Sequence, residues 1–142
     1  LSGAGSYTYA SGDKYVGAFR DDLPNGEGTY SYINGNTYSG GFYNGVKSGQ
    51  GTYTYANGDT YVGSFERNMA HGKGTVTLVA SGNTYTGEFV DDIMEGYGTY
   101  TFGSGGQYVG QFKRDMYNGQ GTFTKADGTQ LKGIWRNDVL QK

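Results

Sequence analysis

Few side chains in this sequence could do chemistry, and they lie far apart. His71 is the only histidine among 142 residues, and there is no cysteine, so disulfides and thiolate metal sites are excluded. A nucleophile activated by a histidine would have to rely on His71 alone. The residues at the same position of the other repeats are all polar: Asn25, Ser48, Glu95 and Asn118. We therefore interpret His71 as one member of a polar loop position and predict no catalytic role for it.

Two acidic pairs, Asp21-Asp22 and Asp91-Asp92, are the other candidates for chemistry. Paired carboxylates suggest calcium, but no EF-hand spacing surrounds either pair, and a turn is the favoured interpretation. The Gly-x-Gly pairs and the glycine-rich segment 103–106 lack a following helix, so they are not typical of phosphate loops. We predict no enzyme, no cofactor and no metal site.

The composition narrows the class of protein. The chain has 28 glycines, 15 tyrosines and 7 phenylalanines but few branched aliphatic residues, so an ordinary two-layer core is not expected. The length suggests one domain. A net charge of −2 gives no support for nucleic-acid binding. The sequence shows neither a signal peptide nor an apolar run of about 20 residues that could cross a membrane. We expect a cytoplasmic protein, or a piece of one.

The elements that position these residues are repeated. Segments such as Gly49–Thr54 and Tyr61–Phe65 alternate glycine or aromatic residues with Gln, Thr, Val or Ser, which is typical of strands, and Ala56-Asn57-Gly58 between them indicates a turn. The first strand of each unit opens with Tyr-x-Gly-x-Phe or a close variant. These openers are spaced by 23, 23, 24, 23 and 23 residues, at Tyr15, Tyr38, Tyr61, Tyr85, Tyr108 and Leu131. The sequence therefore predicts an array of β-hairpins.

The pattern of Tyr-x-Gly-x-Phe, a short polar loop and Gly-x-Gly-x-Tyr about every 23 residues resembles the MORN repeat family over essentially the whole chain. The full repeats are 15–37, 38–60, 61–84, 85–107 and 108–130, with partial repeats at 1–14 and 131–142. The resemblance implies an all-β fold, an elongated single-layer antiparallel sheet of stacked hairpins. It also implies binding or scaffolding roles, often at the cytoskeleton or at the periphery of membranes. Neither end shows a polar cap, so we expect a slice of a longer array.

The spacing of the rings fixes the loop between paired strands. Side chains alternate across a strand, so the glycines and rings of each run share one face and the threonines between them share the other. A two-residue loop would place Tyr38 opposite Ser31 and flip the faces, whereas a three-residue loop places Tyr38 opposite Tyr30. We therefore predict the loop Ile33-Asn34-Gly35, with Gly35 in the left-handed conformation, and about twelve strands in all.

The third full repeat departs from the pattern. Val76 and Leu78 replace aromatic residues, and the segment 79–82 is one residue longer than its counterparts. We expect a loop or bulge to absorb the extra residue, because otherwise every later side chain would change face. A row of apolar residues is also predicted to pack loop against loop along one edge: Leu23, Val46, Met69, Ile93, Met116 and Val139.

The aromatic face is the main candidate for function. A single-layer sheet has no second layer to cover it, and a long exposed apolar stripe usually marks an interaction site. We predict a protein-interaction scaffold whose partner, for example an amphipathic helix, lies along a groove, and which can also form a homodimer. The predicted groove residues are Tyr38, Phe42, Tyr53, Tyr61, Phe65, Tyr85, Phe89, Tyr100, Tyr108 and Phe112.

Two other function classes stay open. The segment 113–142 carries six basic and three acidic residues, a net charge of +3, and suggests contact with anionic lipid or phosphoinositide. The residues for this membrane-associated alternative are Lys113, Arg114, Lys125, Lys132 and Arg136. Recognition of a small ligand, as by aromatic choline-binding repeats, is less favoured, because those repeats are rich in tryptophan and this chain has one.

Overall fold

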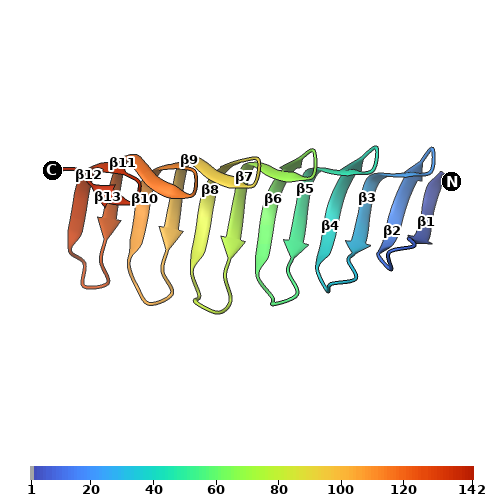
Figure 1. The fold of residues 1–142 in the computed structure, drawn as a ribbon, viewed down its shortest axis with the longest axis horizontal. Helices are drawn as coiled ribbons and strands as arrows, with labels where there is room; N and C mark the ends of the chain where they lie inside the picture. The colour runs from blue at the N-terminus through green and yellow to red at the C-terminus, as the bar shows by residue number, and fades with distance from the viewer. Residues whose placement is uncertain (1) are drawn as a thin grey trace.

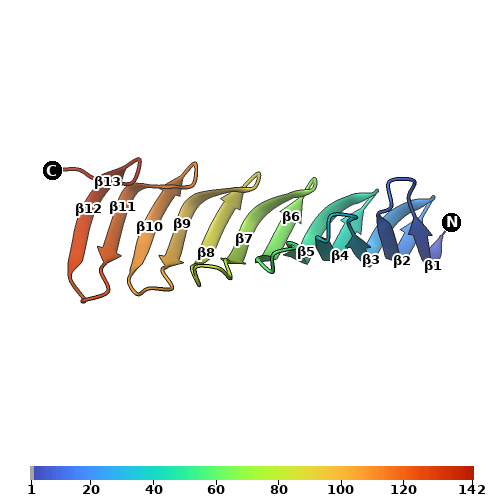
Figure 2. The ribbon, with the colours of Figure 1, turned by 60° about the horizontal axis from the view of Figure 1, so that its bottom comes forward.

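The computed structural model describes residues 2–142, which form one open antiparallel sheet of 13 strands. Strand order in the sheet follows the sequence. The strands lie side by side in an elongated row (Figure 1), and a second view shows the same single row (Figure 2). Residues 2–142 contain no helix, so the predicted all-β, single-layer fold is confirmed. The strands are β1 (Gly3–Thr8), β2 (Lys14–Arg20), β3 (Leu23–Ser31), β4 (Thr37–Tyr43), β5 (Val46–Thr54), β6 (Thr60–Glu66), β7 (Met69–Thr77), β8 (Thr84–Val90), β9 (Ile93–Thr101), β10 (Gln107–Lys113), β11 (Met116–Thr124), β12 (Gln130–Arg136) and β13 (Val139–Leu140).

Three-residue loops close one edge of the sheet, as the ring spacing predicted. The Tyr32 N–H donates to the Asn36 carbonyl oxygen at 2.9 Å, and the Gly35 N–H donates to the Tyr32 carbonyl oxygen at 3.0 Å. Gly35 has a φ of +98°, in the left-handed region. This geometry brings Tyr30 opposite Tyr38 and keeps the rings of both strands on one face.

The loop of the third repeat absorbs its extra residue. The Leu78 N–H donates to the Asn83 carbonyl oxygen at 2.9 Å, and the Gly82 N–H donates to the Leu78 carbonyl oxygen at 2.8 Å. Thr77 then pairs with Thr84, so the strands after the insertion keep the register of the other repeats. The predicted irregularity is therefore confined to the loop.

Two-residue turns close the opposite edge, where the sequence predicted a short polar loop. Both residues of a turn are left-handed, with φ values of 52° and 67° at Asp21 and Asp22 and of 47° and 70° at Asp91 and Asp92. This is the backbone of a type I′ hairpin turn. The interpretation of the acidic pairs as turns is confirmed. Strands run up to the turns, and β3 begins at Leu23, directly after one of them.

The nine-residue strands bend between turn and loop. Gly17 of β2 pairs with Gly28 of β3, but Phe19 pairs with Pro24, so β3 has two more residues than β2 in this interval. The same shift recurs in β5, β7, β9 and β11. Such bulges curve a sheet and increase its twist, and the long strands curve strongly near the turns (Figure 1).

The core is one row of rings packed over glycines. The row consists of Tyr15, Phe19, Tyr38, Phe42, Tyr61, Phe65, Tyr85, Phe89, Tyr108, Phe112 and Trp135, with Ala70 beside it. Each tyrosine meets aromatic rings edge to face, as Tyr15 does with Phe19 and Phe42 at centroid distances of 4.9 and 5.0 Å. The Tyr15 ring covers Gly28, where an added Cβ would overlap it. Glycine therefore lets a one-layer sheet bury its own aromatic row.

Candidate functional site

Most of the predicted groove residues belong to the core. Those that are 7% exposed or less are Tyr38, Phe42, Tyr61, Phe65, Tyr85, Phe89, Tyr108 and Phe112. Only Tyr53 and Tyr100 of the predicted set are half-buried. The accessible rings on the same side form a second row, the outer ring row: Tyr9, Tyr30, Tyr32, Tyr53, Tyr55, Tyr100, Phe102 and Phe123, with Val76 and Leu78 in the third repeat. Sequence reasoning placed the rings on the correct face but did not separate the buried row from the accessible one.

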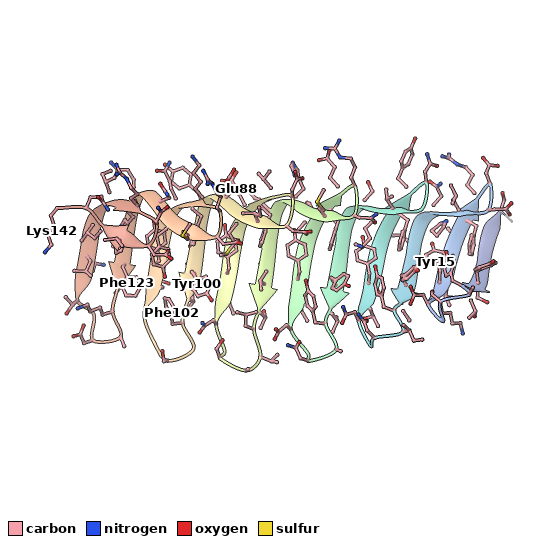
Figure 3. All side chains as sticks on the ribbon, in the orientation of Figure 1. Tyr15, Glu88, Tyr100, Phe102, Phe123 and Lys142 are labelled. Carbon is pink, nitrogen blue, oxygen red and sulfur yellow. The ribbon has the colours of Figure 1, made fainter. Side chains whose placement is uncertain are left out.

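The rings of the outer ring row pack on one another. Tyr32 and Tyr53, from neighbouring repeats, have centroids 5.7 Å apart. Phe102 lies between Tyr100 and Phe123, at 5.0 and 5.7 Å, and all three gather near the loop edge (Figure 3). The aliphatic residues of the third repeat separate these two aromatic stretches. The outer ring row is thus an apolar surface that is aromatic except in the third repeat, where it is aliphatic.

A ladder of side-chain hydrogen bonds holds the loop edge together. Asp13 accepts from the backbone N–H of Ile33 at 2.8 Å, and it also accepts from the Tyr30 hydroxyl at 2.9 Å. The same position in later repeats accepts a backbone N–H of the next loop, at Asn36, Asp59 and Asn83. This ladder was not predicted from the sequence, although the recurrence of Asp or Asn two residues before the first four openers could have signalled it.

A second ladder runs along the turn edge. The Asp92 carboxylate accepts from the Ala70 N–H at 2.7 Å, and the Asp92 N–H donates back to the Ala70 carbonyl oxygen at 2.9 Å. The predicted apolar ladder at this edge is wrong at Leu23, Ile93 and Val139, which are exposed to solvent. The other three members, Val46, Met69 and Met116, are half-buried. Hydrogen bonds therefore join the repeats at this edge.

The residue two positions after each turn points to the ring side, and we call it the inner position. Its occupants are Pro24, Lys47, Ala70, Met94, Tyr117 and Leu140. Tyr117 stacks on Tyr108 with centroids 3.9 Å apart, and most of the others pack against the core as well. The size of this residue therefore decides how much of the ring side is filled in each repeat.

Lys47 occupies the inner position with an ammonium group. Its nitrogen lies 5.6 to 5.8 Å from the centroids of Tyr32, Tyr38 and Tyr53, within the range of cation–π attraction. It also donates to the Tyr32 hydroxyl at 3.2 Å. Burial lowers the pKa of Lys47, and the charge of Asp92 opposes that shift. The ring side can therefore hold a cation among its tyrosines.

A pocket of about 440 Å³ opens beside Ala70, the smallest residue found at the inner position. Tyr55, Tyr61 and Val76 contribute ring and aliphatic surface to its lining. Burial raises the pKa of Tyr61 to about 12, and the charge of Asp92 adds to the shift. The pocket coincides with the repeat in which the outer ring row lacks aromatic side chains.

His71 lies within β7, inside a strand and not in the loop that the sequence predicted. Its Nε2 is 3.5 Å from a Glu66 carboxylate oxygen, and its Nδ1 is 3.5 Å from an Asp91 carboxylate oxygen. At the equivalent position Asn25 donates to the Asn44 side chain at 2.9 Å. The position therefore bridges neighbouring repeats.

The five basic residues of the lipid alternative do not form one patch. Lys113, Arg114 and Arg136 lie at the two-residue turns, whereas Lys125 flanks a three-residue loop at the opposite edge. Lys132 lies in β12, on the face opposite the rings. All five are exposed. Their contact with anionic lipid remains a prediction.

Sequential hairpins, a core of rings over glycines and two hydrogen-bond ladders define a β-repeat array with one aromatic face. The chain belongs to the MORN repeat family, whose model matches residues 1–14, 15–37, 38–60, 61–79, 85–107 and 108–130. Membership in this family fits a protein-interaction module.

Other comparisons add little about function. No curated protein matches the sequence. Among solved structures, the chain is similar to the TCP domain of SAS-4 (dCPAP) in complex with a proline-rich motif of Ana2 (dSTIL) of Drosophila melanogaster, with 12% identity, 93% of this chain and 90% of that chain covered, and a TM-score of 0.39. Residues 2–142 contain no helix long and apolar enough to cross a membrane. Within the same residues, no group of three or more His, Asp or Glu side chains is arranged to hold a metal ion.

Proposed function

We propose that the chain is a non-catalytic scaffold that binds a protein partner along its outer ring row. The observation that carries this proposal is that these rings pack on one another and yet remain partly exposed to solvent. Tyr55, for example, is 48% exposed. Rings that are already held in place lose little side-chain entropy when a partner binds, so they favour association.

An amphipathic helix is the partner that suits this surface best. Its apolar side chains recur on one face and can lie along a row of rings. Tyr53 and Tyr100 of the sequence-predicted set would touch such a helix, and the eight buried rings would form the floor beneath. A second copy of the chain presenting its own outer ring row would give a homodimer. A cytoskeletal or membrane-peripheral location would follow from the partner.

Site-specific photo-crosslinking tests the proposal. A photoreactive phenylalanine analogue is placed at Tyr55, on the ring side, or at Val62, on the opposite face. The two residues are 48% and 50% exposed, so Val62 is a matched control for accessibility. We expect a discrete crosslinked product in native lysate from position 55 that is absent from position 62, and mass spectrometry then identifies the partner.

Two outcomes would count against this function. Crosslinks of equal strength from both positions, or from position 62 alone, would mean that the ring side is not the binding face. Sedimentation with vesicles of anionic lipid is run in parallel. Binding to vesicles that is lost on replacing Lys113 and Arg136 with glutamine would favour the membrane alternative.

A further inference from the structure

Lys47 shows what kind of group the ring side can hold. Its ammonium nitrogen is surrounded by three tyrosine rings, each with its centroid less than 6 Å away, and it donates to one tyrosine hydroxyl. The four-carbon stem reaches the rings from the turn edge, where Asn68 accepts the Lys47 N–H at 2.8 Å. The second repeat therefore contains a lysine bound within its own aromatic cage.

The third repeat keeps two of the three cage tyrosines but lacks the lysine. A shift of 23 residues carries Lys47 onto Ala70 and carries the three cage residues onto Tyr55, Tyr61 and Val76. All three line the pocket beside Ala70. Alanine ends at its Cβ, so the space that the Lys47 side chain fills in the second repeat is open in the third.

Two carboxylates make this pocket attractive to a cation. Asp59 and Asp92 both line it, whereas Lys47 is the only basic side chain in the lining. Neither carboxylate forms an ion pair within residues 2–142. Besides burial and the neighbouring Tyr53, the charges of Asp92 and Asp59 raise the pKa of Tyr55, so their field extends across the pocket.

We propose that the pocket beside Ala70 receives a lysine side chain of the protein partner. The inference rests on the proposed function, because it names the chemistry of a partner at the same face. The apolar stem of a lysine would lie against Val76 and Leu78. Its ammonium group would lie against the rings of Tyr55 and Tyr61, in the part of the pocket between the Asp92 carboxylate at the turn edge and the Asp59 carboxylate at the loop edge. A compact ammonium on a flexible stem is the group that Lys47 already places in the neighbouring cage.

The experiment uses n-butylammonium, which reproduces the lysine side chain, and n-butanol as a neutral probe of the same shape. Both are titrated into the protein with isotope-labelled methyl groups at Ala70, Val76 and Leu78, and chemical shifts are followed by NMR. We expect saturable shifts at these methyl groups with n-butylammonium and much smaller shifts with n-butanol at equal concentration.

Two variants and a control locate the binding. Asp92→Asn removes the charge but keeps a side-chain oxygen for the Ala70 N–H, so it should weaken n-butylammonium binding about five-fold or more. Asp115→Asn makes the same change one repeat later and should leave binding unchanged. Ala70→Lys should fill the pocket with its own side chain, as Lys47 does in its cage, and abolish the shifts at Val76 and Leu78.

The absence of saturable shifts, an equal response to n-butanol, or unchanged binding in Asp92→Asn would overturn the lysine pocket. Photo-crosslinking from Tyr55 separates this failure from failure of the scaffold itself. A crosslinked partner together with no binding of n-butylammonium would retain the scaffold and remove the lysine pocket, whereas loss of both would remove both.

Discussion

Each core tyrosine and the glycine beneath it act as one unit. Tyr38 covers Gly51, and its hydroxyl donates to the Gly41 carbonyl oxygen at 2.9 Å. A Cβ at Gly51 would overlap the Tyr38 ring, so either the ring or the strand would have to move. We expect Gly51→Ala to lower the free energy of unfolding by about 1–3 kcal/mol, the usual effect of overpacking, measured by urea denaturation.

Thr52→Ala is the matched control for this substitution. Thr52 follows Gly51 in β5 and faces the side opposite the rings, where only strand propensity is lost. We expect its effect to stay within about 1 kcal/mol. If Gly51→Ala destabilised the protein no more than Thr52→Ala, the Tyr38 ring would accommodate a Cβ at Gly51 at little cost. That result would contradict the close packing of the ring on this glycine.

The sequence predicted which residues share a face but not which rings are buried. Alternation alone places Tyr30 and Tyr38 on the same side, and the strand register agrees. Burial depends in addition on the bend of the long strands, where Gly26 has a φ of +95° and Gly28 does not adopt the left-handed region. Both glycines belong to one Gly-x-Gly motif, and the motif alone does not predict that their φ angles differ. The difference arises from the pairing of β3 with the strands on both sides of it.

At the scale of elements, each two-residue turn joins one repeat to the one before it. Asp115 has a φ of 66°, and its carboxylate accepts the Met94 N–H at 2.8 Å. Asp115→Ala removes this acceptor and places alanine in the left-handed region, where a Cβ without a polar side chain is disfavoured. We expect it to lower the free energy of unfolding by about 1–2 kcal/mol in urea denaturation.

Asp115→Asn separates backbone and acceptor effects from charge. Asparagine tolerates the left-handed conformation, and Asn68 already fills the equivalent position, where it accepts the Lys47 N–H at 2.8 Å. The stability of Asp115→Asn should therefore stay close to that of the parent chain. A loss equal to that of Asp115→Ala would show that the negative charge, and not the hydrogen bond, stabilises the turn.

The sequence predicted the length of the three-residue loops but not that of the two-residue turns. The three-residue loops followed from the positions of the rings, because a two-residue loop would place the rings of the paired strands on opposite faces. The turns at the acidic pairs were predicted, but their length of two residues was not, because only the pair at 44–45 carries the Asn-Gly signal, while pairs such as Asp21-Asp22 contain no glycine. The left-handed residues of these turns are held by hydrogen bonds to the preceding repeat, as Asp115 is by the N–H of Met94, 21 residues earlier in the chain. Such long-range hydrogen bonds cannot be predicted from the local sequence.

At the scale of the whole molecule, the array is a chain of neighbour contacts. Every strand pairs only with the strands before and after it in sequence, so each repeat depends on its neighbours for packing. Variation at one position then acts locally. Ala70 opens a pocket in one repeat, whereas Tyr117 fills the same place by stacking on Tyr108. A repeat array can in this way combine a uniform fold with a single distinctive site.

The tyrosine row also sets how the whole array responds to alkali. Burial raises the pKa of Tyr61, Tyr85 and Tyr108 to about 12, from an ordinary value of 10.0. The folded chain therefore binds these phenolic protons more tightly than the unfolded chain does. This stabilisation is complete below pH 10 and is lost as the pH rises toward 12. Lys47 acts in the opposite direction, because burial lowers its pKa, but it is one group against several.

We therefore expect the array to unfold cooperatively in alkali, starting above the ordinary pKa of tyrosine. Tyrosinate absorbance and near-ultraviolet circular dichroism are recorded together as the pH is raised, and the buried tyrosines should ionise in the same step in which the tertiary signal disappears. Tyr61→Phe keeps a ring but removes one titrating group, so it should make the loss of stability with pH less steep. Gradual ionisation of the core tyrosines with an intact tertiary signal would contradict the burial of this row, because water and hydroxide would then reach phenols that the glycines and neighbouring rings enclose.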